Sequence, residues 1–356
     1  MNATDAAAAV DVVALGESMV TFLPTRPGRL ADVPSFDRAI GGAESNVAGA
    51  LAAAGHTVRW VSRVGADGFG DHLVETVASY GVDVSCVVRD PARPTGVYFR
   101  TAADRATDAH EVAYYRAGSA ASAMSARTVD LAAVRAGRIL HLSGITAALS
   151  EGCLGLLREL TASAGERPPL VSFDVNYRPR LWIGSGGAEV LLELARRADI
   201  VFVGEDEAEQ AWGVGGGPAA IRELLPEPEV LVVKQGAKGA TAFVSAPAGE
   251  RPAPAAAPGA FEPAPAVGVV ASVGAGDAFA AGFLSGTLRG LPVRRSLRVG
   301  HLFAAAALTT PADFAAPPGR DTTDRLTALD STGWERLRLG PGWTQADAAE
   351  EEARTP

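Results

Sequence analysis

The residues with the clearest capacity for chemistry lie in residues 272–279, whose sequence is SVGAGDAF. Gly274, Ala275 and Gly276 precede the apolar residues 278–288, so they are predicted to stand where a helix begins. Unpaired N–H groups in a first helical turn lie at the positive end of the helix dipole and favour an anion such as phosphate. Asp277 would repel that anion, which favours a role as the base that takes a proton from an attacking hydroxyl.

Two simpler interpretations stay open from this local pattern. Asp277 can be a plain helix cap, a position that Asp often occupies. Residues 267–288 are long and apolar enough to resemble a membrane span, but five glycines and a central Asp argue against one.

The composition is that of a globular protein, with 356 residues, of which 47% are hydrophobic and 21% charged. A net charge of −9 disfavours nucleic acid or an anionic membrane as the main partner. Cys86 and Cys153 form no motif and indicate a reducing compartment. No basic residue precedes the alanines of residues 1–10, so a signal peptide is not expected and the predicted location is cytoplasmic.

Short apolar strands alternate with helices along most of the chain, which predicts an α/β fold with a mostly parallel sheet. Two polar and aromatic segments, 95–100 and 111–116, interrupt this rhythm and predict an antiparallel hairpin outside the main sheet. The Ala- and Pro-rich residues 246–266 are predicted to be a surface loop. The predicted strands are 10–16, 58–64, 82–88, 139–142, 170–174, 200–203 and 230–234, and the predicted helices include 47–54, 68–80, 154–164, 188–197 and 293–308.

Other polar groups stand at the ends of predicted elements, where open α/β sheets place their sites. Gly41 and Gly42 precede a helix and allow close approach of a ligand, although a plain turn capped by Glu44 or Ser45 is an equal alternative. Acidic residues follow one strand and are compatible with a cation site or with an ordinary acidic first turn; they are Glu205, Asp206, Glu207 and Glu209. Arg116 can bind a carboxylate or lie on a solvated strand face.

Taken together, these motifs resemble those of the ribokinase-like carbohydrate kinases over residues 10–330. The resemblance rests on GGAESNVA at 41–48, VGADGFG at 64–70 and VGAGDAFAAGF at 273–283. Within that family the chain is most similar to 2-keto-3-deoxygluconate kinases, which share the early Gly16 and Glu17, YYRAGSAAS at 114–122 and DVNYRPRLW at 174–182.

The resemblance implies a mostly parallel central sheet flanked by helices on both faces, with a small β-strand lid. It implies a single kinase domain over residues 1–336, with lid segments at about 17–41 and 94–117. Residues 337–356 are expected to form an acidic, flexible tail. Lids in this family often pair, so a homo-oligomer is expected.

The activity implied by the resemblance is ATP-dependent phosphorylation of the terminal hydroxyl of 2-keto-3-deoxygluconate, which gives 2-keto-3-deoxy-6-phosphogluconate. Asp277 would be the base, and the N–H groups of Gly274, Ala275 and Gly276 would stabilise the transferring phosphoryl group. Paired arginines suit a sugar-acid carboxylate. The substrate-binding residues that the resemblance implies are Gly42, Asn46, Tyr98, Tyr114, Arg116, Ile145, Arg178, Asp277 and Asp313.

The resemblance also implies binding of ATP and Mg²⁺, with Glu207 in the water network of the metal. Two residues depart from the family pattern: Ala271 stands where Asp is usual, and Gly204 where Asn is usual. The first departure leaves a monovalent-cation site near the glycine turn undecided. The implied nucleotide-binding residues are Lys234, Gly236, Gly239, Gly274, Gly276, His301 and Ala304.

Three alternatives are weighed against this function. A kinase for fructose or another neutral sugar would leave Arg116 and Arg178 without a carboxylate to bind. A non-catalytic regulator that binds sugar or nucleotide is favoured by Ala271 and Gly204 but opposed by the retained Asp277. A dinucleotide-binding oxidoreductase lacks support, because Gly65, Gly68 and Gly70 have the order G-x-x-G-x-G rather than G-x-G-x-x-G.

Overall fold

The structure, a computed structural model, describes residues 9–101, 111–162, 169–184, 186–245, 259–312 and 314–345. Within these residues, nine strands form the central sheet in the order β13-β12-β11-β10-β9-β8-β1-β4-β5. Neighbours from β11 to β5 are parallel, and β12 and β13 are antiparallel additions at one edge. The strands are β1 (Val10–Leu15), β4 (Val58–Gly65), β5 (Val87–Asp90), β8 (Gly137–Ser143), β9 (Leu170–Asp174), β10 (Ile200–Gly204), β11 (Val230–Lys234), β12 (Gly239–Val244) and β13 (Ala260–Pro263).

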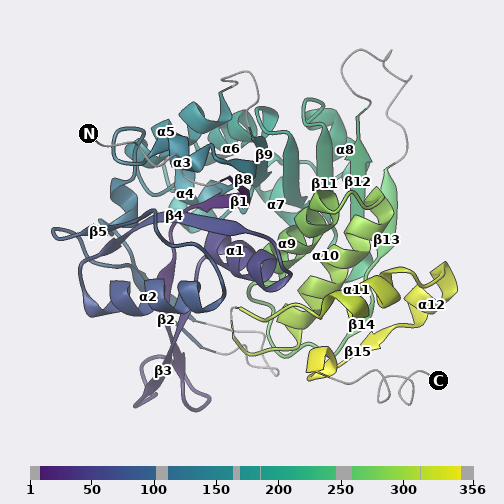
Figure 1. The fold of residues 1–356 in the computed structure, drawn as a ribbon, viewed down its shortest axis with the longest axis horizontal. Coiled ribbons are helices and arrows are strands. Elements are labelled where there is room, and N and C mark those ends of the chain that lie inside the picture. The colour runs from purple at the N-terminus through teal and green to yellow at the C-terminus, as the bar shows by residue number, and fades with distance from the viewer. Residues whose placement is uncertain are drawn as a thin grey trace.

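Helices cover both faces of this sheet (Figure 1). The α/β fold with a mostly parallel sheet is therefore confirmed. The helices are α1 (Ala43–Ala53), α2 (Gly68–Ser79), α3 (Leu131–Val134), α4 (Gly144–Ala147), α5 (Glu151–Thr161), α6 (Gly187–Arg196), α7 (Glu205–Trp212), α8 (Pro218–Leu224), α9 (Ala275–Leu288), α10 (Val293–Leu308), α11 (Arg320–Thr327) and α12 (Ser331–Arg336).

The central strand β1 shows why such strands are apolar throughout. Side chains alternate between the two faces of a strand, and Val12 and Ala14 pack with the core beneath α1, α9 and α10. Val13 and Leu15 pack with the opposite core, beneath α5 and α6. All four side chains are fully buried, so a strand covered on both faces needs an unbroken apolar run.

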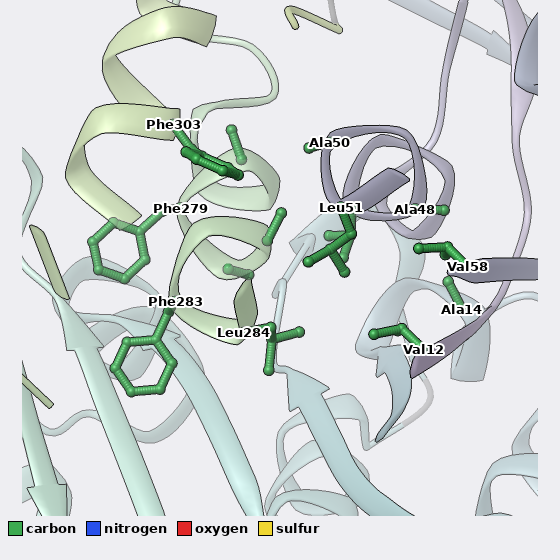
Figure 2. Packing of buried hydrophobic residues seen from close by; sticks show 14 of the residues in the cluster. Val12, Ala14, Ala48, Ala50, Leu51, Val58, Phe279, Phe283, Leu284 and Phe303 are labelled. Atoms are coloured by element: carbon green, nitrogen blue, oxygen red, sulfur yellow. The ribbon is translucent and has the colours of Figure 1, made fainter. Parts of the chain in front are cut away.

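The helices α1 and α9 carry the two glycine-rich segments and lie side by side over this core. Figure 2 shows Leu51 of α1 and Leu284 of α9 between the two helices and the sheet, near Val12. Phe279 of α9 and Phe303 of α10 extend the same packed layer. This packing holds α1 and α9 against each other, and a hydrogen bond from Asn46 to Asp277 joins their first turns.

A second sheet stands away from the first (Figure 1) and has the order β3-β2-β6-β7 within the described residues. The predicted hairpin is confirmed as β6 and β7, which are antiparallel. The rings of Phe22 and Phe99 stack across this sheet, with centroids 4.8 Å apart. Its strands are β2 (Met19–Pro24), β3 (Phe36–Gly41), β6 (Val97–Arg100) and β7 (Val112–Tyr115), and we call it the lid sheet.

The C-terminal segment packs on the loop that leads to the glycine turn. The strand β14 (Ala266–Val267) pairs with β15 (Arg338–Leu339), and Trp343 is buried. Of the predicted tail, residues 337–345 are therefore in contact with the domain, and residues 346–356 lie outside the described residues. The division into a domain and a tail stays a prediction.

Two predicted elements are wrong. In place of the strand predicted at 82–88, β5 begins only at Val87 and runs to Asp90, because the Asp83 carboxylate accepts the Ser85 N–H at 2.9 Å and bends the chain before it. Part of the predicted loop 246–266 is the strand β13, which pairs with β12 through Phe261 and Glu262, while residues 246–258 lie outside the described residues.

The segment that resembles a membrane span in length is divided between β14, the glycine turn and α9. Across the described ranges, none of the helices combines the length and apolar character that crossing a bilayer requires.

Candidate active site

A cavity of about 540 Å³ opens at the carboxyl ends of the parallel strands. The lid sheet forms one wall, and the glycine turn before α9 forms another. It collects residues that the sequence places far apart, as expected at the strand ends of an open α/β sheet. The predicted site residues that line it are Gly42, Asn46, Tyr98, Tyr114, Arg116, Ile145, Arg178, Glu207, Lys234, Gly274, Gly276 and Asp277.

The glycine turn has the geometry of a helix start. Gly274 is the N-cap residue in a left-handed conformation, with φ of 78°, and α9 begins at Ala275. This conformation favours glycine, since a side chain here would clash with the backbone. The first-turn N–H groups lie at the positive end of a 14-residue helix, beside the cavity.

Asp277 lies in this first turn, half-buried at the cavity wall. Burial raises the pKa of Asp277 to about 7, with a further upward contribution from Asp174 and opposing effects of Asn46, Arg178 and Lys234. A carboxylate whose pKa lies near neutral pH is well matched to accept a proton in catalysis.

Asn46 connects the two glycine-rich helix starts. Its Nδ2 donates a hydrogen bond to Oδ2 of Asp277 at 2.9 Å, and the residue is 8% exposed. Its predicted substrate contact stays a prediction, and the structure adds a contact with the expected base. Because one carboxylate oxygen is held in this way, the other is left for a proton.

Lys234 reaches from the end of β11 to the glycine turn. Its Nζ lies 3.1 Å from both carboxylate oxygens of Asp174, and a Cβ added at Gly276 would lie 3.5 Å from the same Nζ. Although burial opposes the charged form, Asp174 and Glu207 hold the pKa of Lys234 above its ordinary value. Lys234 is thus a protonated donor next to the N–H groups expected to bind phosphate.

Two predicted cations, Arg116 and Arg178, differ in how they are held. Arg116 donates Nε to Oε2 of Glu17 at 2.7 Å, and its side chain is 11% exposed. Arg178 lies 3.5 Å from Glu207, and its side chain is 53% exposed. Arg116 is therefore fixed by a buried partner, whereas Arg178 is open to an incoming anion.

Several lining residues were not predicted from the sequence. Asp174 ends the buried strand β9, and Glu17 lies two residues after the end of β1, so a position at a strand end was the signal that marks them. Arg100 lies within the predicted hairpin and donates Nη2 to the Pro311 carbonyl at 3.2 Å, which connects the lid sheet to the end of α10.

Other predicted residues do not line the cavity. Gly236 lies in the loop between β11 and β12, Gly239 is the first residue of β12, and Ala304 lies on α10. His301 is buried, with Nε2 3.1 Å from the Glu262 carbonyl, and burial lowers the pKa of His301 to about 4. Their nucleotide contacts stay a prediction, as does the phosphate contact of Ala275. The predicted site residue Asp313 lies outside the described residues.

Glu207, in the acidic first turn of α7, contacts two groups of the protein. Its Oε2 accepts the N–H of Gly204 at 2.7 Å, so it caps the helix, and its Oε1 faces Arg178. In the described part of the chain, no three His, Cys, Asp or Glu side chains converge as a metal site. Asp206 and Glu209 do not line the cavity.

The sequence of this chain was compared with models of known protein families. A family model described as "pfkB family carbohydrate kinase" matches residues 9–317. The chain belongs to this family. It is therefore a carbohydrate kinase, and the predicted ribokinase-like identification is confirmed.

Relatives match nearly the whole chain. The 2-dehydro-3-deoxygluconokinase of Thermoproteus tenax is 32% identical over 328 residues, which span 91% of this chain and 96% of that protein. The 2-dehydro-3-deoxygalactonokinase of Haloferax volcanii is 30% identical over 310 residues, which span 86% and 93%. The solved structure of a 2-dehydro-3-deoxygluconokinase from Thermotoga maritima has a TM-score of 0.74 and 25% identity, and the match covers 90% of this chain and 99% of that one.

Proposed function

We propose that this carbohydrate kinase transfers the γ-phosphoryl group of ATP to the terminal hydroxyl of 2-keto-3-deoxygluconate, also called 2-dehydro-3-deoxygluconate. The observation that carries the proposal is the position of Asp277, whose carboxylate lies between the glycine turn and the Asn46 side chain in the cavity. Arg116 and Arg178 line the same cavity and suit a carboxylate-bearing sugar. The name of the Thermoproteus relative supports this substrate.

In this mechanism, Asp277 accepts the proton of the terminal hydroxyl as the hydroxyl oxygen attacks phosphorus in line. Asn46 holds Oδ2 of Asp277, which orients the second oxygen toward the substrate. The first-turn N–H groups of α9 and the Lys234 ammonium offset the negative charge on the phosphoryl group. Preorganised donors of this kind need no rearrangement during the reaction.

The residues present fit Mg²⁺ only as an ion held mainly by phosphate oxygens and water. Glu207 is the carboxylate that would join its water shell, because its contact with the half-exposed Arg178 is longer than the buried pair between Asp174 and Lys234. When bound, the ion would neutralise phosphate charge.

We also propose that the protein assembles as a homo-oligomer through the lid sheet. Strand β7 is at the edge of that sheet, and Tyr114 and Tyr115 are 49% and 66% exposed. Size-exclusion chromatography with light scattering should give a dimer or a larger assembly, and Tyr115→Glu should shift it toward the monomer. A monomeric wild type would contradict this proposal.

An ADP-release assay with a panel of sugars tests the substrate. We expect turnover of 2-keto-3-deoxygluconate, with its galactonate epimer as the closest competitor and much weaker turnover of fructose and ribose. Arg178→Ala should raise KM for the sugar acid without raising KM for fructose. Preferential turnover of fructose by the wild type would overturn the proposed substrate while leaving the enzyme class intact.

A further inference from the structure

Glu17 is a buried carboxylate that two parts of the lid region approach, the segment after β7 and the residue before β6. It lies in the connection between β1 and β2, is 3% exposed, and accepts hydrogen bonds from Arg116 and from Oγ of Ser119. A Cβ added at Gly96, just before β6, would lie 3.0 Å from Oε1 of Glu17. The residue before β6 and the residues after β7 therefore both lie beside the Glu17 carboxylate.

The geometry of the pair determines what Arg116 can still do. Both Nε and Nη2 of Arg116 contact Oε2 of Glu17, so one edge of the planar guanidinium is occupied. A guanidinium has donors on more than one edge, and the remaining edge can bind a second carboxylate through two hydrogen bonds. Arg116 and Glu17 both line the cavity, so the guanidinium edge that Glu17 does not occupy is the one available to a substrate there.

The other two ion pairs of the cavity differ from this one in ways that matter for a ligand. Arg178 and Glu207 are 3.5 Å apart, and the arginine is half exposed, so a ligand anion can replace Glu207. Lys234 and Asp174 face the glycine turn rather than the lid. Glu17 has a side-chain exposure of 1%, which makes its pair with Arg116 a permanent part of the wall.

We infer that Glu17 is a positioning residue that fixes the guanidinium of Arg116 in the orientation needed to bind the carboxylate of a sugar acid. This inference rests on the proposed function. Glu17 would not touch the substrate or the transferring phosphoryl group, and its effect on activity passes through Arg116. A shift of about 1 Å in such a binding group can cost about 100-fold in rate.

A double-mutant cycle with Glu17→Gln and Arg116→Gln tests this inference. Glu17→Gln keeps a hydrogen-bond acceptor but removes the charge, and we expect a rise of about 10- to 100-fold in KM for the sugar acid. The KM for ATP should stay within about threefold. Because Glu17 acts through Arg116, the double variant should match Arg116→Gln alone. Additive effects, or an equal rise in both KM values, would overturn the inference.

Asp90→Asn is the matched control, because Asp90 accepts Nε of Arg63 at 2.7 Å in a comparably buried pair that does not line the cavity. It should leave KM for the sugar acid unchanged. If Glu17→Gln does not fold, Ser119→Ala removes the other donor to Glu17 and should raise KM for the sugar acid about threefold. No rise in Ser119→Ala would then overturn the inference. A wild type that phosphorylates fructose but not the sugar acid would instead overturn the proposed function, and the inference with it.

Discussion

The two glycine-rich helix starts carry the same kind of sequence and use it differently. Both place glycine before an acidic residue, Glu44 in α1 and Asp277 in α9. Glu44 is fully buried and accepts hydrogen bonds from Ser143 and Thr146 at 2.9 and 2.6 Å, whereas Asp277 faces the cavity. An acidic residue at a helix start thus becomes a base only where the surrounding elements leave a cavity beside it.

The glycines also serve different needs. Gly42 has extended backbone, and a Cβ there would lie 2.6 Å from the Glu17 carbonyl oxygen, so it is required by close packing. Gly276 has room for a Cβ, whose nearest neighbour would be the Lys234 ammonium at 3.5 Å. The α1 start is therefore built for packing, and the α9 start is built for access of a ligand to the backbone.

The largest expected effect comes from Asp277→Asn. Removal of the base should lower kcat by about 10²- to 10⁴-fold, because positioned proton transfer contributes that much. Thermal unfolding should show a folded protein, since the change removes only a half-buried charge. The matched change Glu44→Gln should retain most of the activity, and equal losses in the two variants would contradict the contrast between them.

A pair of glycine variants should separate packing from access. Gly42→Ala should lower the free energy of unfolding by about 1–3 kcal/mol, because the new methyl group meets backbone atoms that cannot move away easily. Gly276→Ala should leave that free energy nearly unchanged and raise KM for ATP by about tenfold or more, since its methyl group occupies phosphate space. Denaturant titration and initial-rate kinetics distinguish them, and a reversed pattern would refute the assignment.

Asn46→Ala tests the contact between the two helix starts. The hydrogen bond from Asn46 lowers the pKa of Asp277, so its loss should move the acid limb of the pH–rate profile to higher pH. We expect about a tenfold loss of kcat at neutral pH. A lower kcat with an unmoved acid limb would show that Asn46 acts only on the substrate.

The smallest expected effect is the change that Glu44→Gln makes to the pH dependence of the free energy of unfolding. Burial raises the pKa of Glu44, against the hydrogen bonds from Thr146 and Ser143, so the folded protein holds this proton more tightly than the unfolded chain. Its contribution to stability is present at low pH and is lost as pH rises through the folded pKa. Glu44→Gln should therefore gain stability relative to wild type as pH rises above the ordinary pKa of glutamate, as measured by denaturant titration across a pH series. A pH-independent difference would contradict this.

The sequence predicted the fold where local pattern decides it. The bounds of β9, β11 and α10 match the predictions because the two strands are short segments rich in buried apolar residues and α10 is a long amphipathic segment that begins after a proline. The strand β13 was missed because its pairing with β12 and the burial of Glu262 against Arg298 depend on tertiary contacts.

The site was predicted in its parts but not in its connections. Asp277, Gly42 and Lys234 line the cavity as predicted from motifs. The pairs that hold the cations join residues far apart in sequence: Arg116 is 99 residues from Glu17, and Lys234 is 60 residues from Asp174. No local pattern contains that information, because it is created when β1, β9, β11 and the lid sheet meet at one sheet edge.

The pH dependence of kcat/KM for 2-keto-3-deoxygluconate, at saturating ATP and Mg²⁺, tests most directly whether Asp277 is the base. With a pKa of about 7, Asp277 is protonated at lower pH and cannot accept the substrate proton. The account predicts that log kcat/KM rises with a slope of about one up to about pH 7 and then levels off. A flat profile from about pH 5.5 to about pH 8.5 would contradict it.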